Sequence, residues 1–382
     1  MKKAVVIGGS SGIGLAVSKR LIAQGYFIEN VSRNAPTDPN LDSLCYHHNS
    51  SDLRFFDEEL FSRLSLDTEV NVLFIAAGIG RVAAFDQLHS AEIEKTFMID
   101  AIAGIRIVKA FYNRIKSNQD FYCGMMGSIA GLVNSPLFSV YAAAKAGICR
   151  FVESVNIELE ASGINNRILE ISPGYIKGTG FYGGENDPAQ NCALAESILK
   201  HLFIRDTRYI PSYEGVYKSV IERSIIDSHA FGLESYYYKK QSGREQIGRK
   251  PVIGYLSGTF DLFHVGHLNL IQRSKQQCDY LIVGVHDSGK WKGKETFIPF
   301  AERKRIVAAC RYVDKVVDSC TEDSDAWYLW HFDKLFVGSD YKGTERFARY
   351  ESFFSEKKVD IVYFPYTQST SSTQLRDAIK AR

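Results

Sequence analysis

Two stretches of the sequence each place a short apolar run before a glycine-containing turn and an amphipathic segment. The first reads AVVIGGSSGIG over residues 4–14, and the second reads VIGYLSGTFDLFHVGH over residues 252–267. A buried strand, a glycine turn and a helix in this order are the usual opening of a parallel α/β domain. Because alternating strand and helix patterns follow each stretch, the sequence predicts two such domains.

The chain has 382 residues, more than one ordinary hydrophobic core supports. We expect the α/β fold class with two Rossmann-like parallel-sheet domains, a larger doubly wound one over residues 1–232 and a smaller one over residues 251–382, joined by a polar linker over residues 233–250. In the first domain we expect strands at Ala4–Ile7, Phe27–Val31, Val70–Ile75, Phe121–Met126 and Arg167–Ile171, and helices at Gly14–Gln24, Glu92–Ile115 and Val140–Ser162. In the second domain we expect strands at Val252–Leu256, Tyr280–Val285, Lys315–Val317, Lys334–Val337 and Ile361–Phe364.

The composition narrows the classes of partner and compartment. Lysine and arginine number 46 against 44 aspartate and glutamate, so a net charge of +2 gives no electrostatic footprint for nucleic acid. No window approaches the roughly 20 apolar residues of a membrane span, and the N-terminal apolar run is too short for a secretion signal. The seven cysteines are scattered without a CxxC spacing, which favours buried thiols in the cytoplasm over a disulfide framework or a structural metal site.

The first glycine turn has the composition of a dinucleotide-binding turn. Small residues let the backbone approach a pyrophosphate, whose charge is stabilised by the N–H groups at the start of the next helix. At the end of the second strand, where a carboxylate would bind the ribose of NADH, the chain has Ser32 and Arg33, which favours NADPH. The residues that we assign to the turn are Gly8, Ser10, Ser11, Gly12, Ile13 and Gly14.

A tyrosine and a lysine four residues apart form the strongest chemical signal in the first half. Tyr141 and Lys145 share one face of a predicted helix, and Ser128 lies 141 − 128 = 13 residues upstream, at the end of a strand. An ammonium near a phenol favours the ionised form of the phenol, whose ordinary pKa is roughly 10. The phenol can then donate a proton to a carbonyl oxygen while a hydride reaches the carbon, and Ser128 can hydrogen-bond the same oxygen.

On these motifs, residues 3 to about 232 resemble the short-chain dehydrogenase/reductase family. The resemblance implies an NADP-dependent reductase that assembles as a homodimer or homotetramer. It also implies cofactor contacts from Asp52 and Leu53 at the adenine, from Ala77 and Gly78 after the fourth strand, and from Pro173 and Gly174 beside the nicotinamide.

Two departures from this family pattern matter. The family's usual Asn-Asn-Ala-Gly reads Ile75-Ala76-Ala77-Gly78 here, and Asp100 stands where the family has the asparagine of its proton relay. An aspartate adds a negative charge near the site. A second hypothesis therefore stays open, in which this half binds NADP without catalysing a reduction.

The second turn places two histidines one helical turn apart after a phosphate-sized loop. Gly258, Thr259 and Phe260 form the loop, and His264 and His267 flank a glycine at the start of the next helix. Imidazoles at this position suit the binding of a triphosphate. The segment 251–380 resembles the HxGH nucleotidyltransferase superfamily, and within it glycerol-3-phosphate cytidylyltransferase. The resemblance implies that Lys292, Lys294, Arg303, Ser372 and Thr373 contact substrate or nucleotide phosphates.

In that superfamily an alditol phosphate attacks the α-phosphorus of a nucleoside triphosphate, and Mg²⁺ assists by stabilising charge. Tyr366 and Ser369 replace an arginine and a glycine of the cytidylyltransferases, so the preference for CTP over ATP rests on overall similarity. A fused reductase and nucleotidyltransferase suggest consecutive steps: NADPH reduces a keto-sugar phosphate, and CTP activates the resulting alditol phosphate. Ribulose 5-phosphate to CDP-ribitol ranks first, for a capsule or teichoic-acid-like polymer. CDP-glycerol formation from a dihydroxyacetone compound ranks second, and unrelated substrates for the two halves remain a rival hypothesis.

Overall fold

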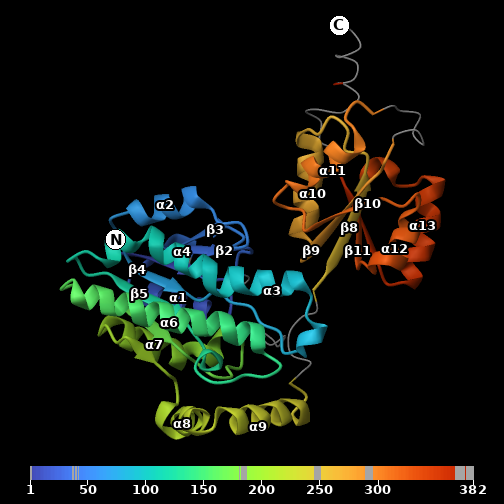
Figure 1. The fold of residues 1–382 in the computed structure, drawn as a ribbon. Helices are drawn as coiled ribbons and strands as arrows, with labels where there is room; N and C mark the ends of the chain where they lie inside the picture. Colours follow the sequence, from blue (N-terminus) through green and yellow to red (C-terminus); the bar gives the residue numbers. More distant parts are fainter. Residues whose placement is uncertain are drawn as a thin grey trace. The chain divides into compact units, whose positions relative to one another are not determined.

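The chain divides into two compact units, Met1–Arg249 and Lys250–Arg382 (Figure 1). The computed structural model describes residues 2–36, 38, 41, 43–179, 181, 187–244, 251–288, 296–365 and 375. Each unit is built around a parallel β-sheet, which confirms the predicted α/β fold class. Among the described residues, no helix is both long and apolar enough to span a membrane.

The described residues of the first unit form a seven-stranded parallel sheet in the order β3-β2-β1-β4-β5-β6-β7. The strand order changes direction between β1 and β4, and ligands of such sheets bind at the carboxyl ends of the strands at this point. The strands are β1 (Lys3–Ile7), β2 (Phe27–Ser32), β3 (Tyr46–Ser50), β4 (Val70–Ile75), β5 (Tyr122–Met126), β6 (Ile168–Ile171) and β7 (Arg208–Tyr209).

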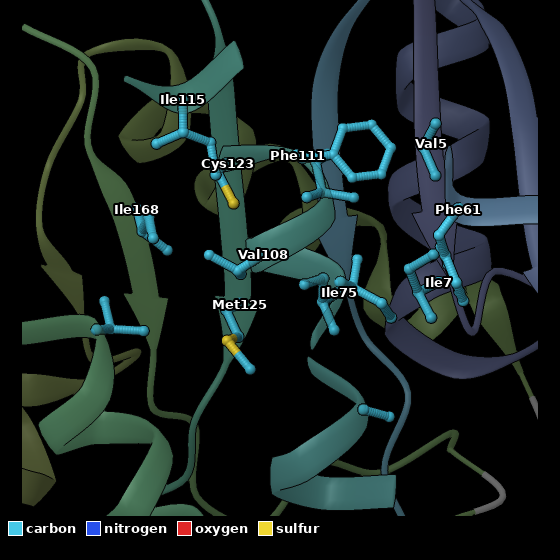
Figure 2. Close-up of a cluster of buried hydrophobic side chains, with 14 of the residues drawn as sticks. Val5, Ile7, Phe61, Ile75, Val108, Phe111, Ile115, Cys123, Met125 and Ile168 are labelled. Carbon is cyan, nitrogen blue, oxygen red and sulfur yellow. The ribbon is translucent and has the colours of Figure 1, made fainter. Parts of the chain in front are cut away.

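Alternating side chains of the strands divide the core of this unit into two layers. On β1, Val5 and Ile7 face the cluster that holds side chains of α2, α4 and α6, whereas Ala4 and Val6 face the cluster that holds side chains of α1 and α7. Figure 2 shows the first cluster, in which Phe61 of α2 lies near β1 and Val108 of α4 lies near β5. The helices are α1 (Gly12–Ala23), α2 (Glu58–Leu66), α3 (Ser90–Phe97), α4 (Ala103–Ala110), α5 (Tyr112–Ile115), α6 (Ser139–Ala161), α7 (Cys192–Phe203), α8 (Lys218–Ile226) and α9 (Ser228–Gln241).

The structure differs from the sequence-based expectation at several places in this unit, among them the short edge strand β7. The single helix expected over Glu92–Ile115 is interrupted by a π-helical turn at Met98–Ile102, between α3 and α4. The polar strand β3 was not expected, because an edge strand needs little apolar alternation. Within the range 233–250, expected to be a linker, residues 233–241 continue α9, whose Lys239 donates hydrogen bonds to Ser135 and to the carbonyl oxygen of Pro136.

The described residues of the second unit form a five-stranded parallel sheet in the order β10-β9-β8-β11-β12. On β8, Tyr255 faces a cluster with α12 and α13, whereas Leu256 faces a cluster with α10 and α11. The strands are β8 (Ile253–Gly258), β9 (Tyr280–Val285), β10 (Lys315–Asp318), β11 (Lys334–Gly338) and β12 (Asp360–Phe364). The helices are α10 (Val265–Gln276), α11 (Phe300–Ala308), α12 (Asp323–Trp330) and α13 (Glu345–Glu356).

Candidate active sites

The glycine turn between β1 and α1 packs tightly against the loop that follows β4. Gly8 and Gly12 have φ angles of +82° and +52°, a region that side chains disfavour. A Cβ atom at Gly14 would lie 2.3 Å from the carbonyl oxygen of Gly8, and one at Gly8 would lie 2.8 Å from the backbone nitrogen of Ala77. The turn therefore requires glycine at these positions, and the Thr179 side chain lies against Gly12 at the start of α1.

The remaining turn residues surround the start of α1. Ser11 is the N-cap residue, and its side chain makes no capping hydrogen bond. Ser10 lies partly exposed in the turn, and Ile13 packs against the apolar cluster beneath α1. An uncapped helix start of this kind suits an anionic ligand such as a pyrophosphate.

The end of β2 carries one exposed cation. The Ser32 hydroxyl is buried, donates to the carbonyl oxygen of Asn34 at 2.9 Å and accepts from Nδ2 of Asn30 at 2.7 Å. Asn30 Oδ1 also accepts the backbone N–H of Gly9 at 2.8 Å, which ties β2 to the glycine turn. Arg33 is exposed and follows β2 directly. Ser32 is therefore used within the protein, whereas the charged side chain of Arg33 is exposed to solvent.

Asp52 is held by a residue that the sequence did not single out. The Arg54 guanidinium contacts the Asp52 carboxylate through Nη2 at 2.6 Å and through Nε at 2.9 Å. Burial raises the pKa of Asp52, but the hydrogen bonds and charge of Arg54 outweigh it and hold the pKa below its ordinary value. The next residue, Leu53, is buried in the apolar core. The structure therefore fixes Asp52 as an ionised side chain.

Tyr141 and Lys145 lie on one buried face of α6, with exposed fractions of 8% and 3%. The Lys145 Nζ atom donates to the carbonyl oxygen of Met126 at 2.9 Å and lies 5.6 Å from the centroid of the Tyr141 ring. The same Nζ atom lies 3.3 Å from the Asp100 carboxylate. The spacing of tyrosine and lysine in the sequence thus places an ammonium beside a phenol, as the helical pattern predicts.

Asp100 lies in the π-helical turn between α3 and α4, and its side chain is completely buried. Both carboxylate oxygens accept the backbone N–H of Ile79 at 3.2 Å. A Cβ atom at Gly78 would lie 2.8 Å from the same carboxylate, so the loop after β4 requires a glycine there. Burial raises the pKa of Asp100 to about 6, against the opposing charge of Lys145. Asp100 therefore connects the loop after β4 to Lys145.

Ser128 lies buried at the end of β5, where its hydroxyl oxygen accepts the backbone N–H of Ala130 at 3.2 Å. The next residue, Ile129, donates its N–H to the carbonyl oxygen of Pro173 at 3.1 Å. This bond joins the segment after β5 to the segment after β6. The Tyr217 hydroxyl covers Gly174, because a Cβ atom at Gly174 would lie 1.6 Å from it.

Aromatic rings cover the phenol of Tyr141. The Phe138 ring stacks on the Tyr141 ring at a centroid distance of 4.2 Å, and the Phe181 ring meets it edge-on at 5.3 Å. Gly80 lies against both phenylalanine rings. Tyr236 of α9 packs against the same cluster. The surroundings of the phenol are therefore largely apolar and include a residue from the C-terminal helix of the unit.

In the second unit, the turn after β8 bends sharply before α10. Phe260 and Leu262 have φ angles of +51° and +49°, which side chains rarely adopt. The Phe260 ring is buried in the core and meets the His267 ring at a centroid distance of 5.3 Å. Gly258 and Thr259 precede this bend. Burial of Phe260 holds the turn in its strained shape.

His264 and His267 cap the start of α10 with their Nδ1 atoms. The Nδ1 atom of His264 accepts the N–H of Gly266 at 3.0 Å, and the Nδ1 atom of His267 accepts the N–H of His264 at 3.4 Å. The two ring centroids are 4.0 Å apart. A neutral imidazole that accepts through Nδ1 carries its proton on Nε2. Both neutral rings therefore carry their proton on Nε2.

Both imidazoles favour the neutral form. Burial lowers the pKa of His264. Burial and the neighbouring His264 together lower the pKa of His267 to about 3, although the charge of Asp261 opposes the change. Without a bound ligand, both rings are therefore neutral hydrogen-bond donors at pH 7.

Arg303 is completely buried and acts on the backbone of three loops. Its Nε atom donates to the carbonyl oxygen of Ile298 at 2.9 Å, and its terminal nitrogens donate to the carbonyl oxygens of Thr259, His286 and Asp287. Four of its five N–H groups are thus used within the protein. The phosphate contact that the resemblance implies for Arg303 stays a prediction, and the contacts seen in the structure are with the backbone.

Asp261 holds the backbone just before α11. Its carboxylate accepts the N–H groups of Phe297 at 3.1 Å and Ile298 at 3.0 Å. Lys292, Lys294, Ser372 and Thr373 lie outside the described residues. Among the described residues, no cluster of three or more His, Cys, Asp or Glu side chains is suited to hold a metal ion.

Sequence reasoning assigned no role to Arg54, Tyr217 or Asp261. Arg54 follows Asp52 by two residues, a spacing that allows a local ion pair, but many surface pairs have it. Asp261 lies within the GTFDLFHVGH motif, and an acidic residue between the apolar residues Phe260 and Leu262 was a usable signal. Tyr217 gave no signal, since only the fold brings it to Gly174.

Comparisons with known proteins match each of the two units separately. Residues 2–189 match the family model of the short chain dehydrogenases, and residues 255–378 match the cytidylyltransferase-like model. The chain is 34% identical over 134 residues to the glycerol-3-phosphate cytidylyltransferase of Bacillus subtilis, an alignment that covers 34% of this chain and 97% of that protein. It is 27% identical over 202 residues to a probable short-chain type dehydrogenase/reductase of Helicobacter pylori, which covers 51% of this chain and 73% of that protein. A crystal structure of a short-chain dehydrogenase from Streptomyces avermitilis matches with 21% identity and a TM-score of 0.49, over 64% of this chain and 100% of that one.

Proposed function

Because the chain belongs to the cytidylyltransferase-like family in its C-terminal part and carries a short-chain dehydrogenase domain before it, we propose that it makes a CDP-alditol in two consecutive steps. In the first, a ketose phosphate is reduced with NADPH to an alditol phosphate. In the second, CMP is transferred from CTP to that alditol phosphate, and pyrophosphate leaves. The observation that carries the proposal is that both domains lie on one chain. Such a fusion is explained if the first domain produces the alditol phosphate that the second domain uses as acceptor. We favour ribulose 5-phosphate as substrate and CDP-ribitol as product, destined for a capsule or teichoic-acid-like polymer.

The first unit has groups that fit a dinucleotide. The glycines of the turn, among them Gly8 and Gly14, suit a close approach of the backbone to a pyrophosphate, and Arg33 supplies a cation at the end of β2 for a 2′-phosphate. When bound, NADPH supplies the hydride for the carbonyl carbon. The Tyr141 hydroxyl donates a proton to the substrate oxygen, the Ser128 hydroxyl hydrogen-bonds that oxygen, and the buried ammonium of Lys145 stabilises the phenolate that forms.

In the second unit, positioning and charge stabilisation carry the reaction. A phosphate oxygen of the alditol phosphate attacks the α-phosphorus of CTP, and the bond from that phosphorus to the pyrophosphate oxygen breaks. His264 and His267 donate their Nε2–H groups to the phosphates, at the start of α10. Arg303 and Asp261 keep the surrounding loops in place. Mg²⁺ would bind together with the triphosphate, whose oxygens are ligands that this ion prefers.

The names of the relatives favour a second candidate. Three glycerol-3-phosphate cytidylyltransferases match the C-terminal part at 29–34% identity. If this chain shares their acceptor, the first unit reduces a dihydroxyacetone compound, and the final product is CDP-glycerol.

A coupled assay tests the proposal. The full chain is mixed with ribulose 5-phosphate, NADPH, CTP and Mg²⁺, and the products are identified by mass spectrometry. We expect CDP-ribitol only when NADPH and CTP are both present, and ribitol 5-phosphate alone when CTP is omitted. Dihydroxyacetone phosphate in place of ribulose 5-phosphate tests the second candidate. Formation of CDP-ribitol from added ribitol 5-phosphate, without any reduction of a ketose phosphate, would contradict the first step and support a non-catalytic NADP-binding unit.

A further inference from the structure

A small pocket opens beside Tyr141 between the loop after β4, α3 and the start of α6. Among the described residues, its walls include one cation, Arg81, and one anion, Glu92. Ser139 and Tyr141 of α6 also line the pocket. Arg81 and Tyr141 line the same pocket. A substrate whose carbonyl oxygen contacts the phenol therefore has its other groups within reach of a charged side chain.

The backbone holds the loop that carries Arg81 next to α6. The N–H of Ala83 donates to the carbonyl oxygen of Leu137 at 2.7 Å, just before α6 begins. Val82 is buried in the same apolar cluster as Tyr141. These contacts fix the position of Arg81 relative to the phenol without any contribution from its own side chain.

Glu92 orients the Arg81 guanidinium and leaves part of it unused. One terminal nitrogen of Arg81 donates to both oxygens of Glu92, at 2.9 and 3.0 Å. Glu92 in turn accepts the N–H of His89 at 2.9 Å as part of a capping box at α3. Within the described part of the chain, Glu92 is the one hydrogen-bonding partner of the Arg81 side chain, so the Nε–H group and the second terminal nitrogen remain as donors. Their planar arrangement matches two oxygens of a phosphate.

We propose that Arg81 binds the phosphate of the ketose phosphate that Tyr141 protonates, an assignment that rests on the proposed function. The guanidinium faces the phosphate with the two donors that Glu92 does not use, and Glu92 holds it in that orientation. The start of α6 at Ser139 adds a favourable helix dipole. Arg81 thereby selects phosphorylated over unphosphorylated carbonyl compounds and is distinct from Arg33, which follows β2.

Kinetics of the full chain with two matched substrates test this assignment. Arg81→Gln should raise KM for ribulose 5-phosphate about 10- to 100-fold, as expected for lost hydrogen bonds to a charged group, and change kcat less than about threefold. The KM for unphosphorylated ribulose should not change. Arg81→Lys, which keeps the charge without the fork, should give an intermediate KM. The control is Arg150→Gln, an exposed arginine of α6 that pairs with Glu153, and it should behave as wild type. An unchanged KM in Arg81→Gln, or an equal loss for both substrates, would overturn the assignment.

A binding measurement separates this assignment from the proposed function. Inorganic phosphate is titrated into the complex of each variant with NADPH, and NADPH fluorescence reports binding. Wild type and Arg150→Gln should bind phosphate, and Arg81→Gln, with an unchanged melting temperature, should bind at least about tenfold more weakly. If wild type reduces no ketose phosphate but this difference holds, the proposed substrate is wrong and the anion site stands. Equal phosphate binding by wild type and Arg81→Gln, or none by wild type, would refute the site.

Discussion

The Nζ atom of Lys145 lies 3.3 Å from the Asp100 carboxylate, and both side chains are buried. This carboxylate adds a negative charge next to the ammonium that stabilises the Tyr141 phenolate in the proposed mechanism. Asp100→Asn removes that charge and keeps an oxygen that can accept the N–H of Ile79. Without the carboxylate charge, the ionised form of the Tyr141 phenol is favoured, and its pKa falls. Because reduction requires the protonated phenol, kcat/KM for reduction should decline at a lower pH in the variant. We expect the midpoint of that decline to move down by roughly one pH unit.

The pH profile of ketose phosphate reduction between pH 6 and 10 provides the measurement. Asp86→Asn, an exposed aspartate in the loop before α3, serves as the control and should keep the wild-type profile. A profile for Asp100→Asn that is unshifted, or shifted to higher pH, would show that the carboxylate does not act on the phenol.

Tyr141→Phe removes the hydroxyl group and keeps the ring between Phe138 and Phe181. We expect kcat for reduction to fall by about 10²- to 10⁴-fold, the usual contribution of a general acid. The affinity for NADPH and the rate of cytidylyl transfer should not change. Tyr237→Phe, on the exposed side of α9, is the control. Reduction within threefold of wild type in Tyr141→Phe would rule out the phenol as the proton donor.

The strands and the Tyr-Lys pair of the first unit were predictable because their periodicity is local. Strand β4 begins and ends where the apolar run does, and Tyr141 and Lys145 share a face because α6 is regular through both residues. The π-helical turn at Asp100 was not predictable. Its residue Asp100 forms a buried ion pair with Lys145, which is 45 residues away in the chain, and no periodic pattern encodes that contact.

Arg303 and α9 show a second limit of sequence reasoning. A basic residue near a phosphate motif suggests a phosphate contact, but the buried guanidinium of Arg303 is used on the carbonyl oxygens of its own loops. The polar composition around Tyr237 suggests a linker. However, Lys239 and Tyr236, on the other face of α9, contact the segment just before α6 and the start of α6. In both cases a polar residue that the sequence suggests is exposed is instead partly or completely buried and bound within the protein. Burial follows from tertiary contacts, which the local sequence does not encode.

Arg33→Gln should change the choice of cofactor. The exposed guanidinium at the end of β2 is available to a 2′-phosphate, and its loss should raise KM for NADPH about tenfold or more while KM for NADH stays unchanged. Initial rates with both cofactors provide the measurement. Arg63→Gln, an exposed arginine of α2, is the control. An equal loss with NADPH and NADH would place Arg33 outside the 2′-phosphate site.

His267 should make the second unit less stable in acid. Its pKa is about 3 in the folded chain, lowered by burial and by His264, against an ordinary 6.5. Between these values the unfolded chain binds a proton that the folded chain does not, so the free energy of unfolding decreases as the pH falls below 6.5. The loss is at most about 1.4 kcal/mol per pH unit. His267→Gln should lose less stability between pH 6.5 and 5 than wild type, measured by denaturant unfolding at both pH values. If the free energy of unfolding depended equally on pH in wild type and His267→Gln, the lowered pKa of His267 would be refuted.

Arg303 is predicted to act through the backbone rather than on the phosphates. In Arg303→Met, buried carbonyl oxygens such as those of His286 and Asp287 lose their donors, which should lower the free energy of unfolding of the second unit by about 3 kcal/mol or more. Because the loop at Thr259 also loses its anchor, kcat for cytidylyl transfer should fall as well. Arg305→Met, on the exposed side of α11, should change neither quantity. Wild-type stability combined with a raised KM for CTP in Arg303→Met would instead indicate a direct phosphate contact, because a missing contact to a ligand leaves the free protein unaffected.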